Sequence, residues 1–199
     1  MRPWVWQPPP ELSAAEQRIV KRVRRAKLFV WLRQWRALLF PEAFQQELAT
    51  MYRESAKGQP PVPPAQLALA TILQAYTGVS DDEVIEALTM DRRWQLVLDC
   101  LDCEEPPFSK GTLVAFRRRL IERGLDRRLV ERTVEVAQQQ GGFGPRQLRA
   151  ALVGFLLAIP SFKTRGDYLA IVTLAFGMMV KSILENIDAV GGPRGLLGM

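Results

Sequence analysis

The chain has 199 residues, which suits one domain or two small ones, and its 48% hydrophobic content is enough for a buried core. Lysine and arginine outnumber aspartate and glutamate by 27 to 21, and residues 1–150 hold +5 of the net charge of +6. This balance favours a polyanion such as DNA as partner, while the complete lack of histidine excludes Ser-His and Cys-His catalysis and His-ligated metals.

The first residues, "MRPWVWQPPPELS", have no apolar core of a signal peptide, so we expect the front part of the chain to be cytoplasmic. Alternating β-branched runs closed by Asn-Gly or Asp-Gly turns are nearly absent, whereas helical periodicity recurs throughout. The sequence therefore predicts an all-α protein.

Residues 13–40 read as one long helix, with Ser13 as its N-cap and apolar residues at spacings of three to five. Pro41 would start a second helix that extends to about Tyr52. The other faces of the long helix carry a run of basic side chains, which is either a solvated face or a surface for phosphates. This run consists of Arg18, Lys21, Arg22, Arg24, Arg25 and Lys27.

"KGQPPVPP", residues 57–64, cannot be helical inside and predicts a linker or stiff turn. Pro64 then suits the first turn of a helix that ends at Gly78, and Ser80 with Glu83 forms a capping box for the next helix. These two helices form a tight helix-turn-helix pair, a shape that is common in proteins without a DNA role. A third helical segment, "DRRWQLVLDCLD", follows.

The segment "SKGTLVAFRRRLIERGLD" predicts a helix with Ser109 as N-cap and Gly124 at its end. Its three consecutive arginines spread over about 200° of the helix, so at least two must face water or phosphate. A further helix is expected from Asp126 to Gln140, followed by a break at the glycine cluster 141–144. The buried stripe of the first helix is expected to be Leu113, Phe116, Leu120 and Ile121.

The two cysteines form Cys100-Leu-Asp-Cys103, a pair with neither a second C-x-x-C nor a histidine to complete a zinc site. We expect two cytosolic thiols, no metal and no cofactor. Four aromatic residues on apolar stripes are expected in the core: Trp31, Trp35, Trp94 and Phe116.

The character of the chain changes after Arg149, because residues 150–162 and 168–180 contain no charge. Each stretch is shorter than the roughly 20 apolar residues that span a bilayer. Residues 151–199 therefore predict an apolar helical tail with weak membrane association rather than a channel.

The front of the chain, about residues 12–151, closely resembles the N-terminal domain of bacterial insertion-sequence transposases of the DDE class. The matching motifs are "LFVWLRQWRALLF", "PPVPPAQLALATILQAYTGVSDDEVIEAL", "RRWQLVLDCL", "PPFSKGTLVAFRRRLIERGLDRRLVERTVEVA" and "GGFGPRQLRAAL". The resemblance implies an all-helical region that binds element-end DNA and is followed by a ribonuclease-H-like catalytic domain.

The tail, about residues 153–199, resembles a different family, the permease subunit of branched-chain amino-acid ABC transporters. The matching motifs are "IPSFKTRGDYLAIVTLAFG" and "GGPRGLLG", and Met178 stands where those permeases commonly carry Glu. Two unrelated genes therefore meet near residues 151–153. The resemblance implies that the first catalytic aspartate would follow "RQLRAAL" and is missing here, so we expect a chain that is not an enzyme and has no small-molecule substrate.

Three parts are expected: a basic helical segment (1–56), a transposase-like DNA-binding region (57–150) and a permease-like fragment (151–199). Three interpretations stay open. The chain is a truncated transposase that retains element-end binding and competes with the full-length transposase, or a remnant of a permease associated with the inner membrane, or an insertion scar without function. An assembly junction would give the same sequence.

The expected DNA contacts are Ser109, Lys110 and Thr112, with Arg117, Arg118 and Arg119 behind them, unless these arginines only solubilise the helix.

Overall fold

A computed structural model describes residues 3–53 and 60–140 of the chain. These residues lie in the first of two compact units, Met1–Leu156. The described ranges contain eight helices and no strand, which confirms the predicted all-α class. The glycine cluster and the tail lie outside the described residues. The helices are α1 (Ala14–Arg22), α2 (Lys27–Leu39), α3 (Glu42–Ala49), α4 (Pro64–Thr77), α5 (Asp81–Met90), α6 (Arg92–Leu98), α7 (Lys110–Glu122) and α8 (Leu125–Gln139).

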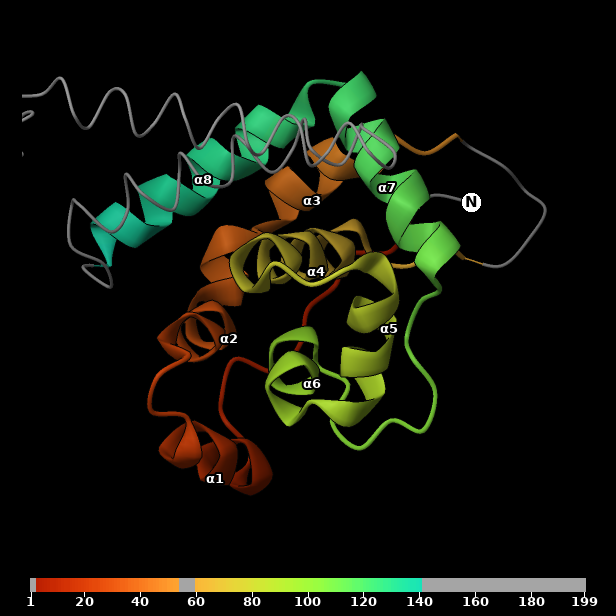
Figure 1. Cartoon of the computed structure of the whole chain (residues 1–199). Helices are drawn as coiled ribbons and strands as arrows, with labels where there is room; N and C mark the ends of the chain where they lie inside the picture. Colours follow the sequence, from red (N-terminus) through yellow and green to blue (C-terminus); the bar gives the residue numbers. More distant parts are fainter. Residues whose placement is uncertain (1–2, 54–59, 141–199) are drawn as a thin grey trace, which may run out of the picture. The chain divides into compact units, whose positions relative to one another are not determined.

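Helix α4 forms the centre of the core, with α3, α5, α6 and α7 packed against it (Figure 1). Every residue from Pro64 to Gln74 is buried, so the helix is covered on all sides. Alanines at positions 65, 68 and 70 keep its surface narrow, which lets its neighbours approach closely. The buried Gln66 side chain is satisfied because its Nε2 donates to the Leu98 carbonyl at 2.8 Å.

Most of the predicted helix boundaries are confirmed by their caps. Ser13 and Ser80 each form a complete capping box, and the Ser109 hydroxyl caps α7. Gly78 ends α4 in the left-handed region at φ 71°, a conformation that a residue with a Cβ rarely adopts. Gly124, at φ 65°, makes the corresponding turn between α7 and α8.

The single long helix predicted from Ser13 to about Phe40 is wrong. The chain leaves the helical conformation at Val23, and α2 begins only at Lys27. The reason is an ion pair between Glu16 Oε1 and Arg33 Nε, which lie 2.5 Å apart. In one continuous helix these residues would be about 25 Å apart, because each residue adds about 1.5 Å. The turn therefore folds α1 back toward α2.

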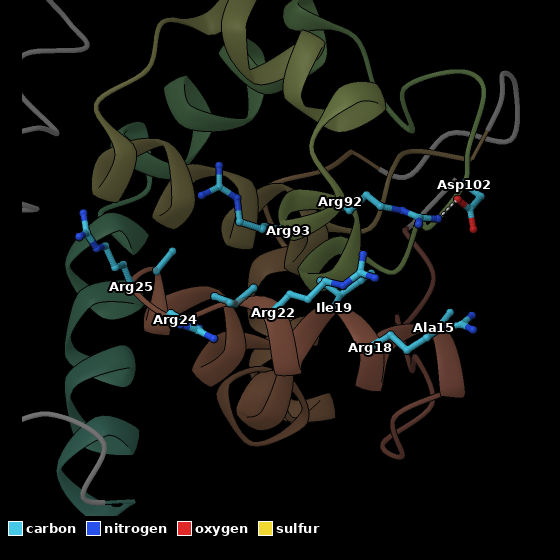
Figure 2. Close-up of a pocket in the computed structure, with 11 residues that line it drawn as sticks. Ala15, Arg18, Ile19, Arg22, Arg24, Arg25, Arg92, Arg93 and Asp102 are labelled. Carbon is cyan, nitrogen blue, oxygen red and sulfur yellow. Dashed lines mark hydrogen bonds and ion pairs between the residues drawn. The ribbon is translucent and has the colours of Figure 1, made fainter.

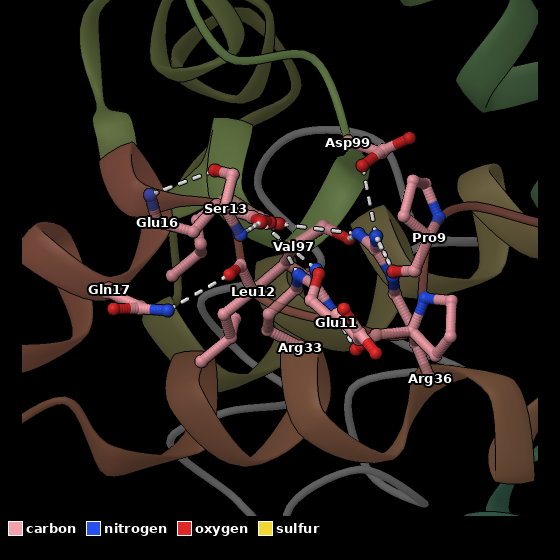
Figure 3. Close-up of polar contacts among 12 residues, drawn as sticks. Pro9, Glu11, Leu12, Ser13, Glu16, Gln17, Arg33, Arg36, Val97 and Asp99 are labelled. Carbon is pink, nitrogen blue, oxygen red and sulfur yellow. Dashed lines mark hydrogen bonds and ion pairs between the residues drawn. The ribbon is translucent and has the colours of Figure 1, made fainter.

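Two arginines of α2, Arg33 and Arg36, are each only 2% exposed and hold the N-terminal segment and the end of α6 against α2 (Figure 3). Arg33 also donates to the carbonyls of Pro10 and Glu11 at 3.3 and 2.8 Å. Arg36 donates to Asp99 Oδ1 at 2.9 Å and to the Val97 carbonyl at 3.1 Å. Backbone carbonyl oxygens and the Asp99 carboxylate thus accept hydrogen bonds from the buried guanidinium groups, because a buried charge needs such partners.

The expected aromatic core is also found. Trp31, Trp94 and Phe116 are buried, and Trp35 is half-buried against the same cluster. The predicted stripe of α7 is buried at Leu113, Phe116 and Leu120, whereas Ile121 is half-buried. Within residues 3–53 and 60–140, no helix combines the length and the apolar character needed to cross a bilayer.

Candidate nucleic-acid interface

The start of α7 presents three of the predicted contact residues together. Ser109 and Lys110 are exposed, and Thr112 is half-buried. The Ser109 Oγ accepts from the Thr112 amide at 3.3 Å and lies 3.0 Å from the Thr112 hydroxyl, so both side chains are used in the cap. Phe108 is buried just before them and anchors the chain where the helix begins.

Lys110 forms an ion pair with Asp82, which weakens its electrostatic attraction for phosphates. Its Nζ donates to Oδ1 and Oδ2 of Asp82, in the first turn of α5, at 2.8 and 2.7 Å. Both side chains are at least half exposed, so this ion pair competes with solvent and salt and is weak. A phosphate would have to displace Asp82 to bind Lys110.

Arg117 occupies a position inside the protein. Its Nη1 and Nη2 donate to the two carboxylate oxygens of Asp81 at 2.6 and 2.7 Å, and Nη1 also donates to Gln74 Oε1. These hydrogen bonds from Arg117 hold the pKa of the Asp81 carboxyl below its ordinary value, although partial burial opposes the shift. The bidentate charge pair joins α7 to α5 at this point, and the hydrogen bond to Gln74 joins α7 to α4.

The other two consecutive arginines lie elsewhere on α7. Arg118 is exposed, with its Nε 3.8 Å from Glu122 Oε1. Arg119 is half-buried, and its guanidinium carbon lies 5.0 Å from the centre of the Tyr52 ring. The structure thus brings Ser109, Lys110 and Thr112 together at the start of α7. Arg118 is exposed about two helical turns further along. The side chains of Arg117 and Arg119 contact protein groups instead.

The solvent face of α7 includes two residues that sequence reasoning missed, Gly111 and Val114. Val114 is 42% exposed, and a Cβ at Gly111 would meet only the Ser109 Oγ, at 3.8 Å. Packing within the described residues therefore does not require glycine here. The 100° spacing per residue places Gly111, Val114 and Arg118 on one face, and that periodicity was the signal that could have found it.

A second basic surface lies where α1, the following turn and the start of α6 meet, in a cleft of about 640 Å³ (Figure 2). We call it the arginine cleft. Within residues 3–53 and 60–140, Asp102 is the one acidic residue that lines it. Sequence reasoning named the basic run of residues 18–27 but did not connect it to α6, 65 or more residues further along the chain. The arginines that line the cleft are Arg18, Arg22, Arg24, Arg25, Arg92 and Arg93.

The cysteine pair offers no comparable site. Both thiols are free and half-buried, and burial together with the neighbouring Cys103 raises the pKa of the Cys100 thiol to about 12. Such a thiol is a poor nucleophile and a poor metal ligand at neutral pH. In the part of the chain that the structure describes, no group of three or more Cys, Asp or Glu side chains could hold a metal ion.

Comparison with known families identifies the helical region. The family model described as "Transposase domain (DUF772)" matches residues 15–119, more than half of the chain. The chain belongs to this family. The match to the transposase domain begins in α1 and ends in α7, so it includes the arginine cleft and the exposed start of α7. The predicted resemblance to transposases is confirmed.

A separate similarity concerns about a quarter of the chain. Over 50 residues the chain is 54% identical to the high-affinity branched-chain amino acid transport system permease protein LivM of Escherichia coli (strain K12) and 52% identical to LivM of Salmonella typhimurium (strain LT2). These matches cover 25% of this chain but only 12% of each permease. The predicted permease resemblance is confirmed over that length. No solved structure matches the chain.

Proposed function

We propose that the chain is a truncated transposase whose helical region binds the DNA ends of an insertion element and which lacks the DDE catalytic domain. Membership of the transposase-domain family supports a role in DNA transposition. The basic balance of residues 1–150 supports a polyanionic partner.

The exposed face of α7 is the observation that carries this proposal. Lys110, Gly111 and Val114 follow a capped helix start, and Arg118 continues the face toward the other end. Gly111 is the second residue of α7, where glycine is less favourable than alanine although it costs less than in a helix interior. A glycine that packing does not require here supports close approach by a partner. In a major groove, Val114 would contact thymine methyl groups and Arg118 would reach base edges or phosphates.

The structure modifies the set of contacts expected from the sequence. Ser109, Lys110, Thr112 and Arg118 stay in the proposed interface. Arg117 supports it indirectly, since its bidentate pair with Asp81 holds α7 against α5.

The test is a binding titration of the full chain with two short duplexes at several salt concentrations. One duplex carries the terminal inverted repeat of an insertion element that encodes a member of this family, and the other carries the same bases in scrambled order. We expect preference for the repeat, with log K falling linearly in log salt. Equal weak binding to both duplexes, or none, would refute element-end recognition and leave the insertion scar as the explanation.

A matched pair of variants separates α7 from general charge. Arg118→Gln removes an exposed arginine from the proposed face, and Arg127→Gln removes an exposed arginine from α8. We expect the first to lower the preference for the repeat and the second to leave the preference unchanged. If both variants kept the preference of the wild-type chain, Arg118 would not read the DNA.

The similarity to LivM supports a second proposal for the remainder of the chain. We propose that this part is a permease remnant that associates weakly with the inner membrane. Recovery of the full chain with the membrane fraction, from which carbonate releases it, would support weak association, and a monodisperse protein in the soluble fraction would refute it.

A DNA-binding chain without the catalytic domain would also inhibit a full-length transposase by competing for the same element ends, which a transposition assay with both proteins would measure.

A further inference from the structure

We propose that the arginine cleft is a binding site for the phosphodiester backbone of duplex DNA, separate from the face of α7. The choice of DNA rests on the proposed function, whereas the site itself rests on the geometry of the cleft. It would supply affinity without reading sequence, and α7 would supply the sequence preference.

The first observation is that four arginines of the cleft have no partner. Arg18, Arg22, Arg24 and Arg25 are exposed, and within residues 3–53 and 60–140 their side chains make no hydrogen bond, ion pair or ring contact. The arginines inside the protein differ in this respect. Arg33 pairs with Glu16, and Arg36 pairs with Asp99.

The second observation is that the two arginines from α6 are held in place. Arg93 Nε lies 3.0 Å from both Asp91 oxygens, and its guanidinium carbon is 5.2 Å from the centre of the Phe29 ring. Arg92 pairs with Asp102, and both of these side chains are more than half exposed. Asp91 and Asp102 offset part of the charge of the α6 arginines, so the unpaired arginines of α1 and the turn carry most of the free charge.

The basic run lines the cleft from both α1 and the turn that follows it. In a straight helix, residues 18, 22 and 25 would already lie within about 60° of one another, and only residue 24 would face another direction. Arginines of α1 and of the turn line the same cleft as the α6 arginines, and they lie in the order Arg25, Arg24, Arg22 and Arg18 across the view (Figure 2). The repulsion between these like charges favours a bound polyanion.

The lining of the cleft fits a phosphate chain better than a small cofactor. Among the residues that the structure describes, only short or aliphatic side chains lie between the arginines, including Ala15, Ile19 and Val23, and none is an aromatic ring that could stack on a base. Asp102 is its one carboxylate, and that group is already paired. An extended ligand with repeated negative charges, and without a need for base contacts, satisfies this arrangement.

The experiment compares two double variants of the full chain that remove the same charge. Arg22→Gln with Arg24→Gln neutralises two unpaired arginines of the cleft. Arg123→Gln with Arg127→Gln neutralises two exposed arginines near the junction of α7 and α8. Far-UV circular dichroism checks the fold of both. Affinities for the inverted-repeat and scrambled duplexes are then measured over a range of salt, with inorganic phosphate as a competitor.

We expect the cleft variant to bind both duplexes about 60-fold more weakly at about 0.1 M salt, and the slope of log K against log salt to fall by about 1.8, because each phosphate contact contributes about 0.9. The ratio between the two duplexes should not change. The control variant should lose much less affinity. Inorganic phosphate should displace DNA no better than chloride of equal ionic strength, since a single phosphate cannot span the cleft.

The outcomes separate this proposal from element-end recognition. Equal affinity of the wild-type chain for both duplexes, reduced only in the cleft variant, would support the cleft and refute element-end recognition. A preference for the repeat with full affinity in the cleft variant would overturn the cleft and leave the α7 proposal standing. Equal losses in the cleft and control variants would overturn it too, as would efficient displacement by inorganic phosphate. Absence of binding to either duplex would refute both proposals.

Discussion

The bidentate pair between Arg117 and Asp81 should be a structural element whose loss unfolds the helical region more readily. Arg117→Met removes the guanidinium but keeps a long apolar side chain, and Asp81→Asn removes the opposite charge. The double variant completes a thermodynamic cycle, which isolates the interaction between the two residues.

The magnitude follows from the burial of the pair. Breaking a fully buried pair costs about 3–5 kcal/mol because the remaining charge has no partner. Here the Arg117 side chain is 9% exposed and the Asp81 side chain 25%, so water can reach the carboxylate in part. We therefore expect each single variant to lower the free energy of unfolding by about 2–3 kcal/mol and the cycle to give a coupling of about 1–2 kcal/mol.

Urea denaturation of the full chain, followed by far-UV circular dichroism, measures these changes. With a slope of about 2 kcal/mol per molar urea, each single variant should lower the midpoint by about 1 M or more. Arg118→Gln is the control, since its side chain is 70% exposed and its contact with Glu122 is long. A loss below about 0.5 kcal/mol in both single variants, with no coupling, would refute the structural role and make Arg117 available for phosphate.

Three further predictions test the other features. Gly111→Ala should raise the free energy of unfolding by up to about 1 kcal/mol yet weaken DNA binding, and unchanged binding would show that no partner approaches this position. Asp82→Asn should release Lys110, raising DNA affinity and steepening the salt slope by about 0.9, while stability in urea changes by less than about 0.5 kcal/mol. Burial alone would raise the pKa of the Glu16 carboxyl, but the hydrogen bonds from Arg33 and Ser13 outweigh it, so the pKa in the folded state lies below the ordinary value of 4.5. The ionised carboxylate therefore stabilises the fold above pH 4.5, and this contribution is lost as the pH falls through the lower folded pKa. Glu16→Gln should therefore cost about 3 kcal/mol at neutral pH and flatten the acid side of the stability profile, and a profile identical to that of the wild-type chain would contradict the pair with Arg33.

The local signals in the sequence were sufficient for most helix ends. The capping residues Ser13, Ser80 and Ser109 act on amides three residues away, and Gly78 acts through its own backbone. These effects depend on neighbours in the chain, so a pattern of residue types is enough to find them. The same holds for the buried stripe of α7, whose spacing repeats along one helix face.

The parts that the sequence did not predict depend on contacts between distant residues. The end of α1 follows from the pairing of Glu16 with Arg33, and the pairing of Asp81 with Arg117 joins residues 36 positions apart. Periodicity cannot detect such pairs, because each charged residue alone looks like a solvated surface position. The face of α7 was missed for a different reason, since Gly111 and Val114 have no charge and draw no attention beside three arginines.

The net charge of the chain therefore says less about binding than the way its arginines are partnered. Arg33, Arg36 and Arg117 are almost fully buried, and each is neutralised by a carboxylate within the helical unit. Their positive charge adds to the composition but contributes little to the field outside. The arginines of α1 and the following turn have no such partners, and the packing of α1 against α6 places them beside Arg92 and Arg93. The unpaired charge of the surface is therefore concentrated at α1 and the following turn, which is why we propose the arginine cleft, rather than the most arginine-rich stretch of α7, as the place where the DNA backbone binds.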